Sequence, residues 1–547
     1  MRILLLSLLF ASTLALPSAR ADRLTIGVSQ YAASLNHLLE ASVAQSYLLG
    51  MTTRPLTLYD AEWNLVCGVC KRLPSFENGL AQRRPLAGGG MGVAVTYELK
   101  PDLAWDDGTP VTAQDFKLAW EIGGDPAVGA LVGEGYRRIL EVTVVDDHTI
   151  TFLNDRVTFN YNASAIIPLP AHLEEAIYRQ DPGSYATRTL YDTNPAAPGL
   201  AFGPYRIVEA RAGSELLLER NPHWSGKQPV FDQVKLVTIN NTAALEANLL
   251  SGAIDMIAGE LGIAVPQALA FERRHGADYR VLFRPSLAYE HIDVNLDRPF
   301  VADRRVRQAL LYAIDRQAIV DRLFGDKQPV AISNLSPLSA NHSDDVPHYP
   351  YDPEKAAQLL EEAGWRLDGK QRKNAGGDSL VLTIGTTAGD RTRELVQQVL
   401  QSQWRAVGVE VRILNAPART FFGQEVRERD YGDLALFAWF AAPGSVPRTT
   451  LRSSEIPTAE NGWAGQNYTG YRNPEVDRLI DELEITIDAE ARKVLWADLQ
   501  RIYMTDLPAL PLYWRATAFI LPKWLGNVRP TGNLSPTTYW IEDWLRN

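Results

Sequence analysis

Short apolar stretches alternate along this chain with segments that carry the signals of helix initiation. Leu24 to Val28 predicts a buried strand. Helix starts are predicted where a polar side chain precedes the first turn, at Thr112, Asp352-Pro353 and Asn473-Pro474. Strands that alternate with amphipathic helices are typical of mixed sheets covered by helices, so we expect an α/β fold.

Asp303 to Phe324 predicts a longer amphipathic helix, because its apolar residues recur near one helical face while arginines and aspartates occupy the rest. After the helix that begins at Asp352, Gly364 predicts the helix end and Asp368-Gly369 a tight turn. Both segments should pack one side against a core.

The first residues have the layout of a cleavable secretory signal. Arg2 precedes an apolar run from Ile3 to Leu16, and the small-residue pattern Ala19-Arg20-Ala21 follows. The run is too short for a comfortable membrane span, and no cysteine follows it to accept a lipid. We therefore expect cleavage after Ala21 and a soluble periplasmic product, not anchored by lipid, that starts at Asp22.

The charge balance argues against a nucleic-acid partner. The chain has 54 Lys and Arg against 65 Asp and Glu, a net charge of −11, which becomes −13 when the two arginines of the leader are removed. Proteins that bind nucleic acids are typically basic. With 46% hydrophobic and 22% charged residues, the mature chain is expected to be a globular monomer of about three domains.

The chain has two cysteines, Cys67 and Cys70. Export to an oxidising space favours a local disulfide between them, and a pair of idle thiols is the alternative. A redox role of the thioredoxin kind would place the pair at the start of a helix, whereas Pro74 and polar residues follow here. Two thiols alone do not make a structural zinc site.

No motif of the commoner hydrolases is present. The sequence lacks a Gly-x-Ser-x-Gly elbow, a His-Glu-x-x-His helix and a cysteine nucleophile beside a histidine. Gly364 to Lys370 has the spacing of a phosphate-binding loop, but Gln371 replaces the Ser or Thr that would bind magnesium. His342 and His348 lie in a loop where solvation is a simpler interpretation than metal ligation. We expect no enzymatic activity, no cofactor and no metal site.

A series of short blocks carries the strongest functional signal. They are Tyr97 to Asp115 (YELKPDLAWDDGTPVTAQD), Gly203-Pro204-Tyr205 with Glu219 to Trp224, Leu249 to Asp255, Asn295 with Arg304 to Leu310, Tyr351 to Trp365, Tyr471 to Asp477, and Leu507 to Tyr513. In these blocks, and in their order along nearly the whole mature chain, the protein resembles the family 5 solute-binding proteins of ABC importers, which take up peptides, opines and nickel.

The resemblance implies a two-lobed periplasmic-binding-protein fold of type II, cluster C, with an additional inserted domain. Lobe I would comprise residues 22–60, 198–286 and 509–547, lobe II residues 287–508, and the inserted domain residues 61–197, after a signal peptide at 1–21. The chain would cross between the lobes near residues 286 and 508. Such receptors trap a solute by hinge closure, so the solute is fully enclosed only in the closed state.

The resemblance also points to residues that would face the solute. The strand Leu434 to Ala442 matches a ligand-facing strand of the family, and its end carries bulky rings. Peptide-binding relatives place an aspartate just after the tryptophan of this strand, where this chain has Ala441-Ala442. Because a buried ammonium without a partner is costly, an ordinary peptide with a free amino terminus is less expected here, unless another acid such as Glu290 substitutes. We expect contacts from Trp439, Phe440, Ala438, Asn467, Tyr468, Tyr289, Glu290 and Ser42. A purely structural turn is the alternative for the loop of Asn467 and Tyr468.

These features predict the extracytoplasmic substrate-binding subunit of an ABC importer, which captures a small, peptide-like solute and delivers it to the permease subunits. Alternatives of the same fold are receptors for a sugar, a sterol or bile-acid-like molecule, or a metal chelate. A secreted hydrolase is the alternative of another class, supported only by export and abundant carboxylates. A sensory or chaperone-like binding protein that never docks to an importer is a third.

Overall fold

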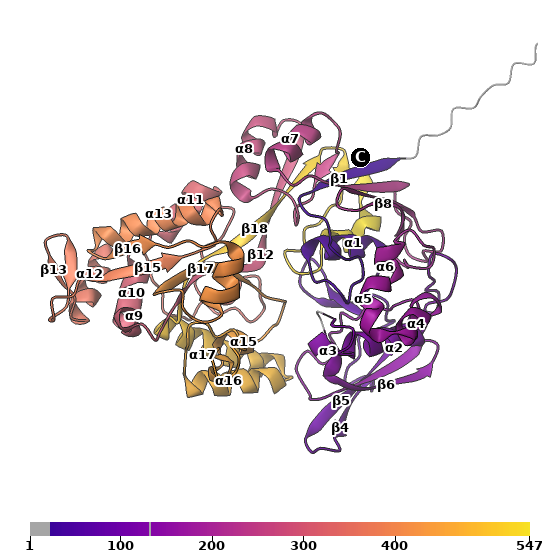
Figure 1. The fold of residues 1–547 in the computed structure, drawn as a ribbon, viewed down its shortest axis with the longest axis horizontal. Coiled ribbons are helices and arrows are strands. Elements are labelled where there is room, and N and C mark those ends of the chain that lie inside the picture. Colours follow the sequence, from indigo (N-terminus) through magenta and orange to yellow (C-terminus); the bar gives the residue numbers. More distant parts are fainter. Residues whose placement is uncertain (1–21, 131–132) are drawn as a thin grey trace, which may run out of the picture.

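The chain folds into two lobes on either side of a pair of long strands (Figure 1). The computed structural model describes residues 22–130 and 133–547. The predicted signal peptide and its cleavage after Ala21 lie outside the described residues. Within that described part, no helix has the length and apolar character needed to cross a membrane.

A ten-stranded mixed sheet runs through both lobes. At its centre, β12 (Tyr279–Val294) and β18 (Ala509–Pro522) lie antiparallel and extend from one lobe into the other. In lobe II the order continues outward with β17 (Leu434–Phe440), β15 (Val381–Gly385) and β16 (Glu410–Ile413). In lobe I it continues with β11 (Met256–Ile257), β1 (Arg23–Val28), β10 (Gln233–Thr238), β9 (Glu215–Arg220) and β8 (Tyr205–Arg211). The α/β fold and the strand expected near Leu24 are confirmed.

The register between β12 and β18 is interrupted where the chain passes between the lobes. Pro285 pairs with Ala516 and Tyr289 with Trp514, so residues 286–288 stand opposite the single residue Arg515. β18 begins just after residue 508, near which the sequence placed the second crossing, and its interruption lies at Arg515. Because such an irregularity weakens the ladder locally, it is the natural point for the lobes to swing. The lobe boundaries themselves stay a prediction.

Lobe I packs short helices against its half of the sheet. They are α1 (Val43–Thr52), α7 (Thr242–Leu250) and α8 (Val265–His275), with η4 (Thr537–Asp543) and the strand pair β19 (Leu525–Gly526) and β20 (Leu545–Arg546) near the C-terminus. Gly50 allows α1 to lie directly on η4, because a Cβ at this position would collide with Thr538. The C-terminal segment is thereby fixed to lobe I.

The inserted domain has a four-stranded sheet of its own, in the order β4 (Ala81–Pro85), β5 (Met91–Glu98), β7 (Thr149–Asn154) and β6 (Ile139–Asp146). Its helices are α2 (Ala113–Gly124), α3 (Gly133–Arg137), α4 (Ala171–Gln180), η1 (Pro182–Ser184), α5 (Tyr185–Arg188) and α6 (Leu190–Thr193). The hairpin of β2 (Thr57–Tyr59) and β3 (Leu65–Cys67) precedes this sheet. Leu24, Val95 and Phe116 belong to one continuous apolar core, which fixes the inserted domain to lobe I.

Lobe II has a separate core. Its helices are α9 (Pro299–Ala302), α10 (Arg304–Tyr312), α11 (Arg316–Phe324), α12 (Pro353–Glu362), α13 (Arg391–Ala406), α14 (Ala418–Thr420), η2 (Phe421–Val426), α15 (Arg448–Leu451), η3 (Ser453–Glu455), α16 (Pro474–Ile485) and α17 (Ala489–Asp506). A hairpin of β13 (Arg366–Asp368) and β14 (Gln371–Lys373) lies at its outer end (Figure 1).

The helix starts predicted in the inserted domain and in lobe II can be compared with the structure directly. Those at Thr112, Asp352 and Asn473 are confirmed by α2, α12 and α16, each of which begins at the next residue. The helix predicted from Asp303 to Phe324 is instead two helices. The chain turns after Tyr312, and Asp315 caps the second helix by accepting a hydrogen bond from the Ala318 backbone N–H (2.9 Å).

Candidate functional site

Two cavities lie between the lobes and meet at one loop. The larger, about 620 Å³, is walled mainly by lobe I and the inserted domain. The smaller, about 350 Å³, is walled mainly by the segment 441–451 after β17, with residues of β12, β17 and α17, and Trp63 reaches it from the other side. Ala442, Pro443 and Ser445, in the loop after β17, line both cavities. Cavities of this size are typical of small-molecule binding sites.

The end of β17 presents two aromatic rings to the smaller cavity. Trp439 is half-buried, lines the cavity and stacks on Tyr468, with ring centroids 5.6 Å apart. Phe440 also lines the cavity and is 68% exposed, which is unusual for a phenylalanine. Ala438 lines neither cavity, because it faces away from them while its backbone pairs with Glu290. Trp439 and Phe440 therefore lie where a solute can touch them, and the contact expected at Ala438 stays a prediction.

Alternate residues of β12 face the smaller cavity. Leu287, Tyr289, His291 and Asp293 all line it, as the two-residue period of a strand requires. Tyr289 is 5% exposed, and its hydroxyl lies 3.2 Å from the hydroxyl of Tyr503 on α17. Tyr289 is thus a fixed part of the cavity wall.

Glu290 points to the opposite face of the sheet and is a structural acid. Its carboxylate is fully buried, and both oxygens accept hydrogen bonds, Oε1 from Arg393 Nε (2.7 Å) and Oε2 from Arg515 Nε (2.6 Å). Burial alone would raise the pKa of this carboxyl, but the guanidinium groups of Arg515 and Arg393 hold the pKa below its ordinary value. The strand period turns Glu290 away from the cavity and gives it two arginine partners instead, and its role as a substitute for the missing acid stays a prediction.

The loop before α16 supports the site from behind. Asn467 is fully buried: Nδ2 donates to the carbonyl oxygens of Arg452 (3.0 Å) and Tyr471 (2.9 Å), and Oδ1 accepts from the Thr469 hydroxyl (3.0 Å). With these atoms hydrogen-bonded within the protein, the geometry favours the structural turn for Asn467, and a solute contact there stays a prediction. Tyr468 lines neither cavity and braces the ring of Trp439 instead.

Ser42 is a helix cap. Its hydroxyl accepts a hydrogen bond from the Gln45 backbone N–H (3.1 Å), which satisfies one of the free donors at the start of α1. It lines neither cavity, whereas Gln45, Ser46 and Leu49 line the larger one. Ala41, directly before Ser42, also lines the larger cavity, so Ser42 lies at its edge and a solute contact there stays a prediction.

Several buried polar residues of the cavity walls were not predicted from the sequence, among them two histidines and an aspartate. His37 lines the larger cavity, and burial lowers its pKa to about 4, although the nearby Ile167 carbonyl acts in the opposite direction. His291 and Asp293 line the smaller cavity. His291 and Asp293 could have been predicted, because they lie on the same face of the strand as Tyr289 at two-residue intervals. His37 could not, because only the tertiary packing brings it to its cavity.

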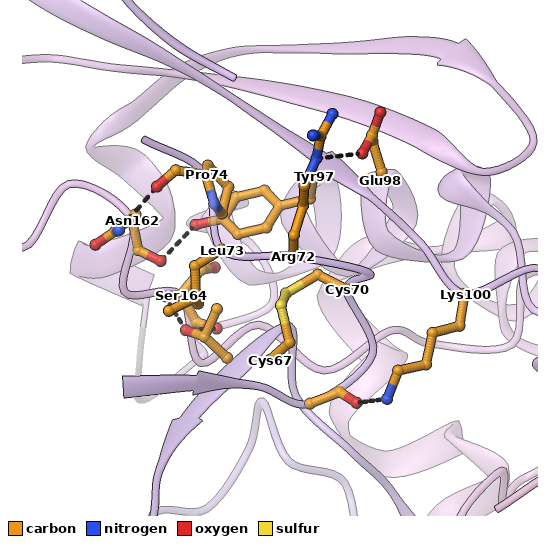
Figure 2. Close-up of a disulfide and its surroundings, with 12 residues drawn as sticks. Cys67, Cys70, Arg72, Leu73, Pro74, Tyr97, Glu98, Lys100, Asn162 and Ser164 are labelled. Carbon is orange, nitrogen blue, oxygen red and sulfur yellow. Dashed lines mark hydrogen bonds and ion pairs between the residues drawn. A yellow bond between two sulfur atoms is a disulfide. The ribbon is translucent and has the colours of Figure 1, made fainter. Parts of the chain in front are cut away.

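A disulfide joins Cys67 to Cys70 behind the wall of the larger cavity (Figure 2). Cys67 ends β3, whose partner strand β2 supplies Thr57 to that wall. Lys100 Nζ donates to the Gly68 carbonyl oxygen (2.9 Å) inside the small disulfide loop. The bond therefore stiffens a support of the cavity and has the position of a structural staple.

The cavity walls are built for binding. Aromatic rings and isolated polar groups, among them His37, His291 and Asp293, dominate the linings. Among residues 22–130 and 133–547, no group of three or more His, Cys, Asp or Glu side chains is arranged to hold a metal ion. Apolar walls with a few placed polar groups suit the selective binding of a small solute.

The chain is similar to solute-binding proteins in sequence and in structure. Residues 92–454 match the family described as bacterial extracellular solute-binding proteins, family 5, middle. The periplasmic oligopeptide-binding protein OppA of Escherichia coli is 26% identical over 463 residues, which cover 79% of this chain and 78% of that protein. The nickel-binding periplasmic protein of Escherichia coli is 22% identical over 532 residues, which cover 96% of this chain and 95% of that one. The crystal structure of the oligopeptide-binding protein from Thermus thermophilus, complexed with a pentapeptide, has a TM-score of 0.73, 25% identity and 96% coverage of both chains.

Proposed function

Because this chain belongs to the bacterial extracellular solute-binding proteins of family 5, we propose that it is the extracytoplasmic substrate-binding subunit of an ABC importer. It captures a peptide or peptide-like solute between its lobes and delivers it to the permease subunits. The main support is the pair of cavities, which are lined from both sides of the cleft and lie next to the irregular crossing of β12 and β18.

Closure of the lobes supplies the affinity in this proposal. Phe440 is 68% exposed at the end of β17, and bringing the lobes together around a solute would bury its ring. Full burial of such a ring is worth about 1.5–3 kcal/mol. Trp439 beside it is held by its stack on Tyr468, so part of the binding surface is already ordered before the solute arrives.

The same proposal includes the location and the partners. We propose a periplasmic monomer without a lipid anchor, without enzymatic activity and without a nucleic-acid partner. The leader pattern and the acidic charge of −11 support this. We propose the division into lobe I, lobe II and an inserted domain at residues 61–197. The separate apolar cores support the division between the two lobes, and a four-stranded sheet of its own supports the inserted domain.

Identification of the bound solute tests the proposal. Protein purified under native conditions is denatured, and the released molecule is identified by mass spectrometry; a short peptide is expected. The Phe440→Ala variant should bind this peptide at least about tenfold more weakly by calorimetry, as about 1.5–3 kcal/mol implies, while its unfolding midpoint stays unchanged. Leu367, which is 55% exposed in the outer hairpin of lobe II and lines neither cavity, provides the matched control, and Leu367→Ala should bind the peptide as tightly as wild type. Recovery of only a sugar or a sterol would refute the proposal that the solute is a peptide. Hydrolysis of peptides by the pure protein would refute the proposal that it is a receptor without enzymatic activity.

A metal chelate is the second candidate solute. The nickel-binding relative aligns with 96% of this chain, and each cavity contains a buried histidine, His37 or His291. Elemental analysis of the natively purified protein distinguishes the two candidates. Stoichiometric nickel or iron that leaves together with an organic chelator would support this candidate against the peptide.

A further inference from the structure

The smaller cavity contains one acid and no strong base. Asp293 is 4% exposed, and the residues that line the cavity include no lysine, no arginine and no second acid. Within the described part of the chain, the only basic side chain with a nitrogen within 4.0 Å of its carboxylate is His291. A buried carboxylate without a full counter-charge is costly, so this cavity favours the arrival of a cation.

His291 places a second acceptor beside this carboxylate. Its Nδ1 lies 3.0 Å from the Tyr289 carbonyl oxygen, which can only accept, so Nδ1 carries the proton of the neutral ring. In the neutral ring Nε2 is then an acceptor; it lies 3.1 Å from Asp293 Oδ1 and, among the described residues, has no hydrogen-bond partner of good geometry. Asn334 Oδ1, another acceptor without a partner there, belongs to a side chain in the same wall. These acceptors call for a group that donates several hydrogen bonds.

Aromatic rings surround the acceptors. Tyr289 stacks on His291 with centroids 4.8 Å apart, and Phe437 meets the same imidazole edge-on at 4.8 Å. Phe437 lies behind the wall, which Trp439 and Trp514 complete. The faces of such rings are electronegative and attract a cation within about 6 Å of the centroid. The carboxylate of Asp293, the acceptor atoms beside it and the faces of the aromatic rings therefore all favour a positively charged group.

We infer that the smaller cavity binds a cationic group of the solute, an ammonium or a guanidinium, through Asp293 and His291 inside this aromatic wall. The inference rests on the proposed receptor function and specifies its solute class. Ala442 and Pro443 line both cavities, so a peptide in the larger cavity can extend its cationic group into the smaller one. Asp293 thereby takes the role of the acid that is absent after Trp439, but from the neighbouring strand β12.

The alternative to this inference is that the side chain of His291 is a positively charged imidazolium. If His291 is protonated in the receptor, it neutralises Asp293, and the cavity then favours an uncharged group. The charge of the solute distinguishes the two cases, because removing it changes affinity only if the cavity itself supplies the counter-charge.

A series of matched ligands on wild-type protein tests the inference without any mutation. Calorimetry compares one tripeptide sequence with lysine, acetyl-lysine or norleucine, each with a free and an acetylated amino terminus. We expect one of the two cations, the side chain or the terminus, to be worth at least about tenfold in affinity, as for hydrogen bonds to charged groups. Equal affinity for charged and uncharged members would overturn the inference and leave the receptor function intact.

Two variants of the protein test whether Asp293 is the source of the preference for a cationic group. Asp293→Asn keeps the shape of the side chain and should lose the preference for the cation, while its affinity for the uncharged peptide stays the same. Asp430→Asn, which changes an acid of lobe II with an 82% exposed side chain, serves as the matched control and should retain the preference. A preference that survives Asp293→Asn would overturn the assignment. If Asp293→Asn does not fold, the wild-type ligand series decides.

Agmatine and cadaverine separate the inference from the proposed function. Suppose that no peptide binds, that these amines bind, and that Asp293→Asn abolishes binding of the amines. The proposal of a peptide solute then fails, whereas the inferred cation site is supported. If neither class binds, both fail.

Discussion

Replacing Glu290 with glutamine should destabilise the protein without removing a direct solute contact. The carboxylate is fully buried and bonds to Arg393 and Arg515, whose side chains are 9% and 33% exposed. Removal of one partner from a buried ion pair costs about 3–5 kcal/mol. Since solvent screens part of the charge of Arg515, we expect about 3 kcal/mol for Glu290→Gln.

The same carboxyl predicts a pH dependence. Its pKa in the folded protein lies below the ordinary value, so its contribution is fully present above the pKa of the unfolded chain, about 4.3. The contribution is lost as the pH falls from there through the lower pKa of the folded state. The difference in unfolding free energy between wild type and Glu290→Gln should therefore be constant near neutrality and shrink below about pH 4.3.

Urea unfolding at pH 7 and pH 4, followed by tryptophan fluorescence and circular dichroism, measures both effects. Asp368→Asn is the control, because Asp368 and Lys373 form an exposed pair, with side chains 66% and 41% exposed, that should be worth less than about 1 kcal/mol. If Glu290→Gln were as stable as wild type but had lost solute affinity, Glu290 would be a ligand anchor and the reasoning would be refuted.

Three further changes test other parts of the structure. The double variant Cys67→Ser/Cys70→Ser opens a loop of four residues and should lose about 2 kcal/mol in urea unfolding; an unchanged midpoint would contradict the role of a staple. Asn467→Ala leaves two or more buried carbonyl groups without a donor and should cost about 1–3 kcal/mol, whereas weaker solute binding at full stability would contradict the structural role. His37 has a folded pKa of about 4 because of its burial, so the unfolded chain takes up the proton first and stability should fall by up to about 3 kcal/mol from pH 6.5 to pH 4. The His37→Gln variant should lose less over the same range, and parallel curves for the two proteins would contradict this.

Local chemistry made much of the fold predictable. Helix starts at Asp352 and Asn473 depend on a side chain and the backbone N–H groups of the next turn, so a few adjacent residues suffice to recognise them. The strand near Leu24 is equally local. The break at Asp315 was missed because apolar periodicity continues across a turn when both helices pack on the same core.

The roles of the site residues depended on distant parts of the chain. The period of β12 separates Tyr289 and His291 from Glu290 in any strand, but periodicity alone does not tell which face meets a cavity. That was decided by partners far away in sequence, since Arg393 and Arg515 stand 103 and 225 residues from Glu290. Likewise, His291 and Asp293 become a pair of acceptors in an aromatic wall only because β17, β18 and α17 close around them. Residue order thus determined the elements and the family, whereas long-range packing decided which side chains remain free to bind a solute, because burial and partners are properties of the assembled fold.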